Sequence, residues 1–466
     1  MNDPAAADLC RLLVRAPSRS FEIAVPSDVP LSELLPTFVL YAEGDNGEDL
    51  DESGLEHDGW VLQQLGDEPF EEDETAGSLG LCHGETLYLR PRRDQLPPIH
   101  FDDLTDGVAT GMAERGDRWR PAYTRMLLQG LSLAVLVTGL AVLVTGGLGG
   151  LTALTAASSA VLMLLSAWAA SRAMGDLLAS TGLATTAVLY MALAGASVPT
   201  GEPGLKLAGA MVLAAAMAAA GASVLGLAAV AGSVPFFAGL FTVEVLTLLG
   251  ALALMFLPGA SVPAVAGLIA LIALLLGTFV PQLAFRAAGL RLPPLPANPE
   301  QLQEGIDPFP ARAVLDRTQL ADRFQTALYG AIGAVLTVCL VVLALEPGWV
   351  EVSLCVIVSL VVLLQARGAT SAWQRAFMVG PAWIGLTALA LAFAWTAGPL
   401  ARSLTLLTLF AVTAVLAIVS WAVPGRRQLP HWGRAAEIIQ IVLCVAVFSL
   451  VLAGFGVFGA LRSIGG

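Results

Sequence analysis

The sequence carries little charge for its length, since only 13% of its 466 residues are Asp, Glu, Lys or Arg and 56% are hydrophobic. A soluble globular chain contains about 25% charged residues. Each membrane-spanning helix, in contrast, needs about 20 mostly apolar residues in succession. The shortage of charge therefore excludes an ordinary soluble protein and predicts a polytopic α-helical membrane protein.

Motifs for catalysis, metal binding and nucleotide binding are also missing. The five cysteines form no Cys-x-x-Cys pair, and the adjacent Cys82 and His83 are poorly placed to bind one metal ion. The chain contains neither a G-x-x-x-x-G-K-[ST] loop for phosphates nor a G-x-S-x-G nucleophile turn. We therefore expect no enzyme activity, no cofactor and no metal, and we expect the cysteines to be buried thiols in a reducing compartment.

The charges that are present are divided unevenly along the chain. Residues 1–125 contain 26 acidic residues and 10 arginines, whereas residues 126–466 contain 11 acidic and 14 basic residues. A strongly acidic front part repels nucleic acid and anionic lipid head groups, so it favours a basic protein as partner. The start MNDPAAADLC lacks the basic and apolar parts of a secretory signal, so the first membrane span is expected to direct insertion.

Residues 1–93 are expected to form a small cytoplasmic domain. Two strands are predicted to bury alternate residues: Cys10, Leu12 and Val14, then Phe21, Ile23 and Val25. The helix that follows has one apolar face: Leu31, Leu34, Leu35 and Phe38. Pro36 lies within this helix and predicts a kink or an early end, because proline cannot donate a backbone hydrogen bond. A third strand begins near Trp60, and a last strand follows the turn His83-Gly84-Glu85.

This order of strand, strand, helix, strand and strand is that of the β-grasp fold and resembles ubiquitin. Ubiquitin acts through a free diglycine tail, but here the last strand continues directly into RPRRDQLPP. The domain is therefore expected to dock to a partner and not to serve as a tag. Gly465-Gly466 follow the final span, and we assign them no role.

A run of acidic residues, DEPFEEDE, supplies the candidate docking residues of this domain. They are Asp67, Glu68, Glu71, Glu72, Asp73 and Glu74. One interpretation is a solvated surface loop, and the other is a charged contact with a basic partner. The following residues 94–125 are expected to form an amphipathic linker near the membrane surface, because their later part is rich in arginine.

Residues 126–466 are expected to form an eleven-helix transmembrane domain. The apolar runs cover 126–147, 151–170, 177–198, 205–230, 234–257, 262–285, 322–345, 349–366, 372–396, 400–421 and 434–458. Hydropathy alone also allows ten or twelve spans, because the third, fourth and fifth runs lack sharp separators. With eleven spans and a cytoplasmic N-terminus, eleven arginines fall in cytoplasmic loops, and only Lys206, Arg402 and Arg462 fall outside. This distribution supports eleven spans and a periplasmic C-terminus.

Glu244 is the one acidic residue that lies clearly in the middle of a predicted span, in FTVEVLTLL. A charge at this depth costs about 3 kcal/mol on insertion scales, so the residue is a candidate for function. It is either a structural acid that is neutral or hydrogen-bonded to a neighbouring helix, or a residue with a role in transport or assembly. The Pro-rich cytoplasmic loop 286–321 is either a second docking surface or a tether.

The whole arrangement resembles the EccD family of type VII (ESX) secretion membrane proteins. The resemblance rests on VPLSELLP, GETLYLRPR, PPIHFDDLTDGVA and the LPPLP loop after the sixth span, and it covers nearly the whole chain. The composition, rich in Ala and Arg with a single Lys, suits an actinobacterium such as a mycobacterium. The acidic stretch 42–58 leaves open which ESX system the chain serves.

The resemblance implies a non-catalytic core subunit of a secretion complex in the bacterial inner membrane. The implied partners are a second copy of the chain, an FtsK/SpoIIIE-like ESX ATPase, other ESX membrane subunits, lipids, and secreted WXG and PE/PPE proteins reached through the complex. The ubiquitin-like domain would dock the ATPase. The alternative is a secondary transporter with an N-terminal regulatory domain, which predicts polar residues and broken helices near the middle of the membrane.

Overall fold

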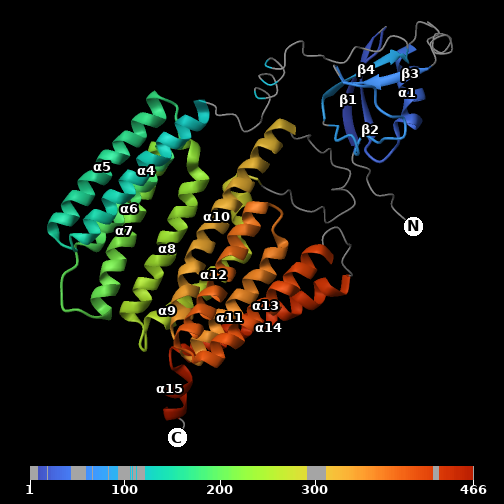
Figure 1. The fold of residues 1–466 in the computed structure, drawn as a ribbon. Helices are drawn as coiled ribbons and strands as arrows, with labels where there is room; N and C mark the ends of the chain where they lie inside the picture. Colours follow the sequence, from blue (N-terminus) through green and yellow to red (C-terminus); the bar gives the residue numbers. More distant parts are fainter. Residues whose placement is uncertain are drawn as a thin grey trace, which may run out of the picture. The chain divides into compact units, whose positions relative to one another are not determined.

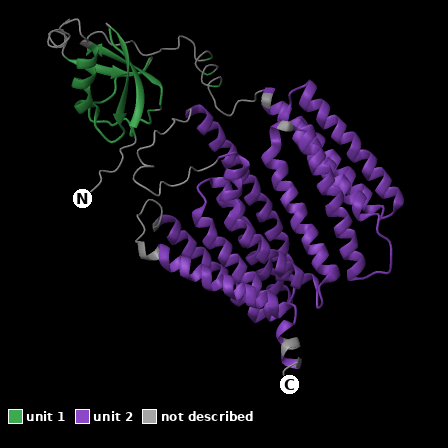
Figure 2. Ribbon diagram, turned by 180° about the vertical axis from the view of Figure 1, so that it is seen from behind, with its two compact units in different colours: residues 1–120 green, residues 121–466 purple. Residues whose placement is uncertain are grey.

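The computed structural model describes residues 9–17, 19–43, 59–65, 67–81, 83–92, 105, 108, 112, 121–290, 311–422 and 430–464. The chain divides into two compact units, residues 1–120 and residues 121–466 (Figure 2). Most of the predicted linker 94–125, much of the loop 286–321 and the final two glycines lie outside the described residues.

The first unit is a four-stranded sheet with one long helix (Figure 1). Its elements are β1 (Leu9–Arg15), β2 (Ser20–Pro26), α1 (Leu31–Glu43), β3 (Trp60–Gln63) and β4 (Glu85–Pro91). The strands lie in the order β2-β1-β4-β3, and the central pair β1 and β4 is parallel while the outer pairs are antiparallel. First and last strands side by side are the mark of the β-grasp fold, so the predicted fold of this domain is confirmed.

The core of this unit lies between α1 and one face of the sheet. Its buried residues are Cys10, Leu12, Val14, Val25, Leu31, Phe38, Val39, Ala42, Leu62, Ala76, Leu87 and Leu89. In β1 the buried residues alternate as the sequence predicts, because successive side chains of a strand point to opposite faces. Phe21 and Ile23 of β2 are only partly buried and pack at the margin of the core.

Helix α1 continues through Pro36 to Glu43, so the early end predicted at this proline is wrong. A proline inside a helix costs about 3 kcal/mol, because it removes one hydrogen bond and crowds the preceding turn. Leu31 and Phe38, which lie on either side of Pro36, are 1% and 0% exposed. Burying a large apolar side chain contributes about 1.5–3 kcal/mol, so these contacts offset the cost of the proline.

The second unit contains eleven helices, within the described residues, that are long and apolar enough to cross a membrane. They are α4 (Pro121–Thr145), α5 (Gly150–Ala173), α6 (Leu177–Ala196), α7 (Leu205–Ala229), α8 (Val234–Phe256), α9 (Val262–Ala287), α10 (Ala311–Leu345), α11 (Trp349–Gln365), α12 (Ala372–Thr396), α13 (Pro399–Ala422) and α14 (Pro430–Gly454). The short helix α15 (Val457–Ile464) follows them. The predicted number of spans is confirmed.

Helix α10 is longer than its apolar run. The sequence places a span at 322–345, but the helix begins at Ala311 and has 35 residues. At 1.5 Å per residue it is about 52 Å long, compared with a hydrocarbon layer of about 30 Å. Charged residues such as Arg312 and Asp316 precede the apolar run and lie in the same helix. They do not interrupt it, because charged side chains are compatible with a helical backbone in water.

The helices of the membrane unit pack partly in chain order and partly across it. Helices α5, α6, α7 and α8 pack in chain order, while α10 packs against α8, α9 and α12 (Figure 1). Close approach depends on small residues: a Cβ added to Gly239 of α8 would lie 2.7 Å from the carbonyl oxygen of Ala327 on α10. Helices α4 and α13, in contrast to α8 and α10, have no fully buried residue in their most apolar stretch.

We predict that Phe38→Ala will destabilise the first unit by about 3–5 kcal/mol, because it opens a cavity at a fully buried site. Leu40→Ala is the matched control on the same helix, since Leu40 is 67% exposed and its removal leaves no cavity. Hydrogen exchange mass spectrometry of the full chain should show faster exchange in β1 and β4 for the first variant only. Equal protection in both variants would contradict the core described above.

Candidate functional site

The predicted docking residues lie on one segment at the surface of the first unit. Asp67, Glu68, Glu71, Glu72 and Asp73 are exposed, and Glu74 is half-buried. Five of the six side chains are thus accessible to a partner, as either interpretation of the acidic run requires.

The backbone of this segment is fixed against the start of α1. The amides of Leu31 and Ser32 donate to the carbonyl oxygens of Glu74 and Glu72, each over 2.8 Å. These two amides belong to the first turn of α1, where backbone N–H groups have no acceptor within the helix. The amide of Phe70 donates to the carbonyl of Leu62 at 2.9 Å and ties the segment to β3. The acidic side chains therefore project from an anchored backbone.

One member of the acidic segment has an ion pair within the described part of the chain. The guanidinium of Arg92 lies 2.7 Å from a carboxylate oxygen of Glu72, and both side chains are about half exposed. An exposed pair of this kind contributes about 0–1 kcal/mol. The remaining carboxylates make this surface strongly acidic, and the positive end of the α1 dipole nearby stabilises their charge.

Glu244 lies midway along α8 and is 5% exposed. The hydroxyl of Ser223 on α7 donates to its Oε1 atom at 2.5 Å, whereas no described residue bonds to its Oε2 atom. Ser223 is itself 1% exposed, so both polar groups are removed from lipid. The structure thus shows the hydrogen bond to a neighbouring helix that one of the two interpretations predicted, and the function of Glu244 stays a prediction.

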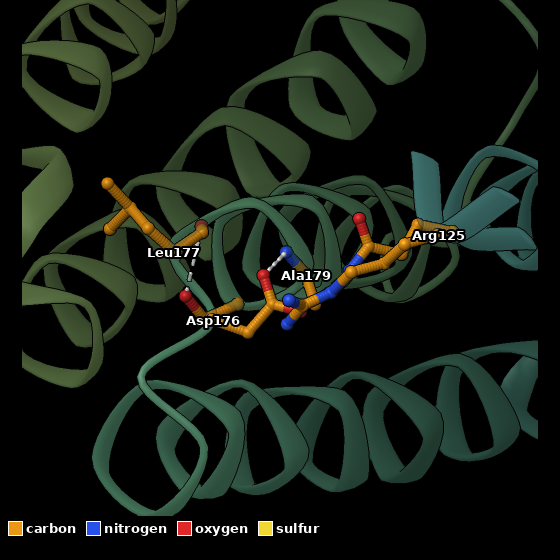
Figure 3. Close-up of polar contacts among 6 residues, drawn as sticks. Arg125, Asp176, Leu177 and Ala179 are labelled. Atoms are coloured by element: carbon orange, nitrogen blue, oxygen red, sulfur yellow. Dashed lines mark hydrogen bonds and ion pairs between the residues drawn. The ribbon is translucent and has the colours of Figure 1, made fainter. Parts of the chain in front are cut away.

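A third polar cluster joins α4 to the start of α6 (Figure 3). Arg125 and Gln129 of α4 donate to Oδ2 of Asp176 at 2.7 and 2.6 Å. The other carboxylate oxygen accepts from the amide of Ala179 at 3.1 Å, so Asp176 also caps α6. Asp176 is 9% exposed, whereas the Arg125 side chain is 62% exposed.

The pKa of Asp176 is lowered from its ordinary value. The main cause is the hydrogen bond from the Ala179 amide, followed by the one from Arg125, and both outweigh the partial burial of the carboxylate. Asp176 is therefore ionised at neutral pH and holds one end of α4, while the hydroxyl of Tyr190 on α6 donates to the carbonyl oxygen of Leu136 further along the same helix at 2.8 Å. An aspartate just before an apolar helical run is a sequence signal for the cap, but nothing in the sequence identifies Arg125 or Gln129 as its partners.

The described residues include no group of three or more His, Cys, Asp or Glu side chains placed to hold a metal. His83 has a structural contact, since its Nδ1 atom accepts from the amide of Arg11 at 3.0 Å. Cys82 lies outside the described residues. The structure gathers the acidic docking residues in the first unit and pairs Glu244 with Ser223 in the second.

The family of EccD-like transmembrane domains matches residues 124–464, nearly the whole of the second unit. This chain belongs to the EccD family. A second family, described as the YukD protein of the WXG100 protein secretion system (Wss), matches residues 9–89 of this EccD chain. That match covers the strands and helix of the β-grasp unit.

Two relatives match this EccD chain over nearly their whole length. The ESX-4 secretion system protein eccD4 of Mycobacterium tuberculosis is 27% identical over 98% of this chain and 97% of its own. The ESX-3 secretion system protein EccD3 of Mycolicibacterium smegmatis is 28% identical over 93% of this chain and 95% of its own.

Two solved structures share the fold of this EccD chain. Protomer 1 of the ESX-3 core complex matches with a TM-score of 0.59 and 22% identity, over 97% of this chain and 100% of the other. A chain of the MycP5-free ESX-5 inner membrane complex in State II matches with a TM-score of 0.60 and 20% identity, over 89% and 99%. The order of a β-grasp unit followed by eleven helices is therefore shared with chains of known structure.

We predict that Asp176→Asn will lower the melting temperature of the purified protein at neutral pH. A lowered folded-state pKa means that the carboxylate stabilises the fold above its unfolded pKa, and that this contribution disappears as pH falls through the folded value. The difference in melting temperature between wild type and variant should therefore be largest near pH 7 and should shrink below about pH 4. Asp316→Asn, at an exposed position of α10, is the control and should leave no such gap.

We further predict that Glu244→Gln will leave assembly and function intact, because the amide oxygen can still accept from Ser223. Ser223→Ala should destabilise the protein by about 1–3 kcal/mol, because it leaves a buried carboxyl group without its donor. Thermal unfolding in mild detergent measures the stability of the Ser223→Ala variant, and recovery of bound subunits together with a functional assay measures the effect of Glu244→Gln. A Glu244→Gln variant that assembles normally but has lost function would instead assign a proton-relay role to this residue.

Proposed function

We propose that this EccD-family chain is a non-catalytic core membrane subunit of a type VII (ESX) secretion complex in the bacterial inner membrane. The proposal is supported above all by the joint match of one chain to the EccD-like transmembrane family over residues 124–464 and to the YukD family over residues 9–89. Two relatives that carry ESX names match over almost their full length, so the same two parts occur in the same order in them.

In this proposal the ubiquitin-like unit docks the FtsK/SpoIIIE-like ATPase of the complex. Support comes from the acidic segment 67–74, whose backbone is anchored while five of its carboxylates are exposed. Preorganised charge favours fast and specific association with a surface of opposite sign. Energy for transport would come from the partner, in keeping with the lack of a nucleotide-binding motif in this sequence.

The proposed topology has a cytoplasmic N-terminus and a periplasmic C-terminus. If each helix crosses once, Arg172, Arg286 and Arg375 lie at helix ends on one side, whereas Lys206 and Arg402 lie on the other. The excess of basic residues on the first side supports its placement in the cytoplasm.

The proposed partners within the membrane are a second copy of the chain, other ESX subunits and lipids. Helices α4 and α13 bury none of their most apolar stretch within the chain, so much of their apolar surface is free for such contacts. Secreted WXG and PE/PPE proteins would be reached through the assembled complex and not by this chain alone.

The alternative of a secondary transporter is favoured by one observation, the buried Oε2 atom of Glu244 that lacks a described partner. Transporters place such groups near the middle of the membrane, often between helices that are interrupted there. Helix α8, however, is continuous from Val234 to Phe256. The alternative therefore rests on a single carboxyl group.

Purification in mild detergent followed by mass spectrometry tests the proposed function. We expect recovery of an FtsK-like ATPase and further membrane subunits with the wild-type chain. Replacing Glu68, Glu71 and Asp73 by lysine should weaken capture of the ATPase by at least about tenfold, since attraction becomes repulsion. It should leave the membrane subunits bound.

The control carries lysine at Glu22, an exposed position of β2 outside the acidic segment. It should capture the ATPase as the wild type does. A wild-type preparation that contains only this chain and moves a solute across liposomes would contradict the proposal and support the transporter. Full ATPase capture by the triple variant would retain the secretion subunit but reject the acidic segment as its docking surface.

A further inference from the structure

A groove runs along α10 between α8 and α12 in the membrane unit. Its volume is about 670 Å³. The residues that line it are Gly232, Ser233, Pro235, Phe236, Gly239, Leu240, Val243, Asp322, Arg323, Thr326, Ala327, Gly330, Ala331, Ala334, Ser371, Trp373 and Phe377. Polar groups gather near Asp322, and the part toward Ala334 is apolar.

The groove continues into a second apolar cavity of about 350 Å³ between α7, α8, α9 and α10. The two share Val243 of α8 and Ala334 of α10 in their walls. Along α10 the lining residues run from Asp322 to Val342, which at 1.5 Å per residue is about 30 Å. This length equals the hydrocarbon thickness of a typical bilayer, so each cavity occupies about one leaflet.

Small residues create the floor of the groove. Ala327 and Ala331 are four residues apart, as are Gly330 and Ala334, so the four small residues lie along one side of α10. Gly239 lets α8 approach the Ala327 carbonyl on one side of this face. Ala334 is exposed in the chain as it stands, so its methyl group points into open space and not into a packed core.

The polar end of the groove carries both signs of charge. Asp322 and Arg323 are adjacent and exposed on α10, and an apolar run begins directly after them. The side-chain amide of Gln374, which is fully buried on α12, donates to Asp322 Oδ1 at 2.8 Å and thereby fixes the carboxylate. Arg323 forms no ion pair with any residue in the described part of the chain.

An exposed tryptophan marks this end as the membrane interface. Trp373 is 69% exposed and lies with its ring centroid 6.2 Å from that of Phe377, and both line the groove. Tryptophan prefers the level of the lipid head groups, where its ring meets hydrocarbon and its N–H meets water. The charged pair therefore lies at head-group depth, with the small-residue floor beneath it.

We propose that this groove binds one phospholipid with an amine in its head group, such as phosphatidylethanolamine. Arg323 binds the phosphate, Asp322 binds the ammonium group, and an acyl chain lies along the small face of α10. The volume is typical of a small-molecule site, and it is too small for a partner helix about 10–12 Å across. A lipid with a purely anionic head group fits less well, because the fixed carboxylate of Asp322 repels it. The proposal depends on membrane insertion and not on the secretion function.

Native mass spectrometry of the full chain tests this site, with the protein released from nanodiscs that contain equal amounts of phosphatidylethanolamine and phosphatidylglycerol. We expect the wild type to retain one phosphatidylethanolamine under conditions that strip other lipids. Ala334→Leu fills the groove and should abolish this retention. Ala414→Leu, at an exposed position of α13, makes the same change on an unpacked helix and should leave it unchanged.

The head-group contacts have tests of their own. Arg323→Gln should weaken retention by about tenfold, the usual effect of losing one charge-assisted hydrogen bond. Arg312→Gln, at an exposed position of α10 nearly three turns before Asp322, is the control. Asp322→Asn should shift the preference from phosphatidylethanolamine toward phosphatidylglycerol, because it removes the repulsion of anionic head groups.

Three results would overturn the proposal. Wild-type retention of phosphatidylglycerol equal to that of phosphatidylethanolamine rejects the amine-specific head group. Unchanged lipid retention in Ala334→Leu and Arg323→Gln, with melting temperatures like the wild type, rejects the site itself. A photo-crosslinker at position 334 that labels a protein subunit in native membranes, and not a lipid, assigns the groove to a partner protein.

Discussion

The membrane part of this molecule depends on one constraint: hydrocarbon offers no hydrogen bonds, so each polar group at depth must find a partner within the protein. The backbone satisfies the constraint by forming eleven continuous helices. Lipid provides no hydrophobic drive between these helices, so small residues and interhelical hydrogen bonds determine how they pack. Within the membrane Ser223 with Glu244 joins α7 to α8; nearer the membrane surface Gln374 with Asp322 joins α12 to α10, and Arg125 with Asp176 joins α4 to α6. Each link thus connects helices that the chain places in different spans.

The same constraint explains how much could be predicted from the sequence. Spans and strands follow from the periodicity of apolar residues, and both the eleven helices and the β-grasp order were predictable. The continuation of α1 beyond Pro36 was not, because the burial of Leu31 and Phe38 is a tertiary effect that overrides a local signal. Hydropathy places the start of the seventh span at residue 322 although α10 begins at Ala311, because hydropathy detects the membrane-embedded part of a helix and not its extension into water. Ser223 could not be matched to Glu244, since the pair depends on how two helices are rotated about their axes.

In the first unit, the backbone and the side chains of the acidic segment have separate roles. Carbonyl oxygens of Glu72 and Glu74 accept from the first amides of α1, while most of the carboxylates face water. The sequence predicted the exposed charge but not the backbone contacts, because any residue type can supply a carbonyl. This separation bears on docking, since an anchored backbone reduces the entropy lost when a partner binds. Changes of side-chain charge can therefore alter partner choice without removing the contacts that hold the segment in place.

Helix α8 connects the two features of the membrane unit that are chemically unusual. Val243 lines the lipid groove toward α10, whereas the next residue, Glu244, bonds to Ser223 of α7. Adjacent residues of a helix point about 100° apart, so one rigid element presents its two faces to the two sites. A rotation of α8 that closed the groove would also move the Glu244 carboxylate relative to Ser223. A buried carboxyl group that loses its hydrogen-bond donor costs free energy. The hydrogen bond from Ser223 therefore keeps α8 in the orientation in which the groove is present.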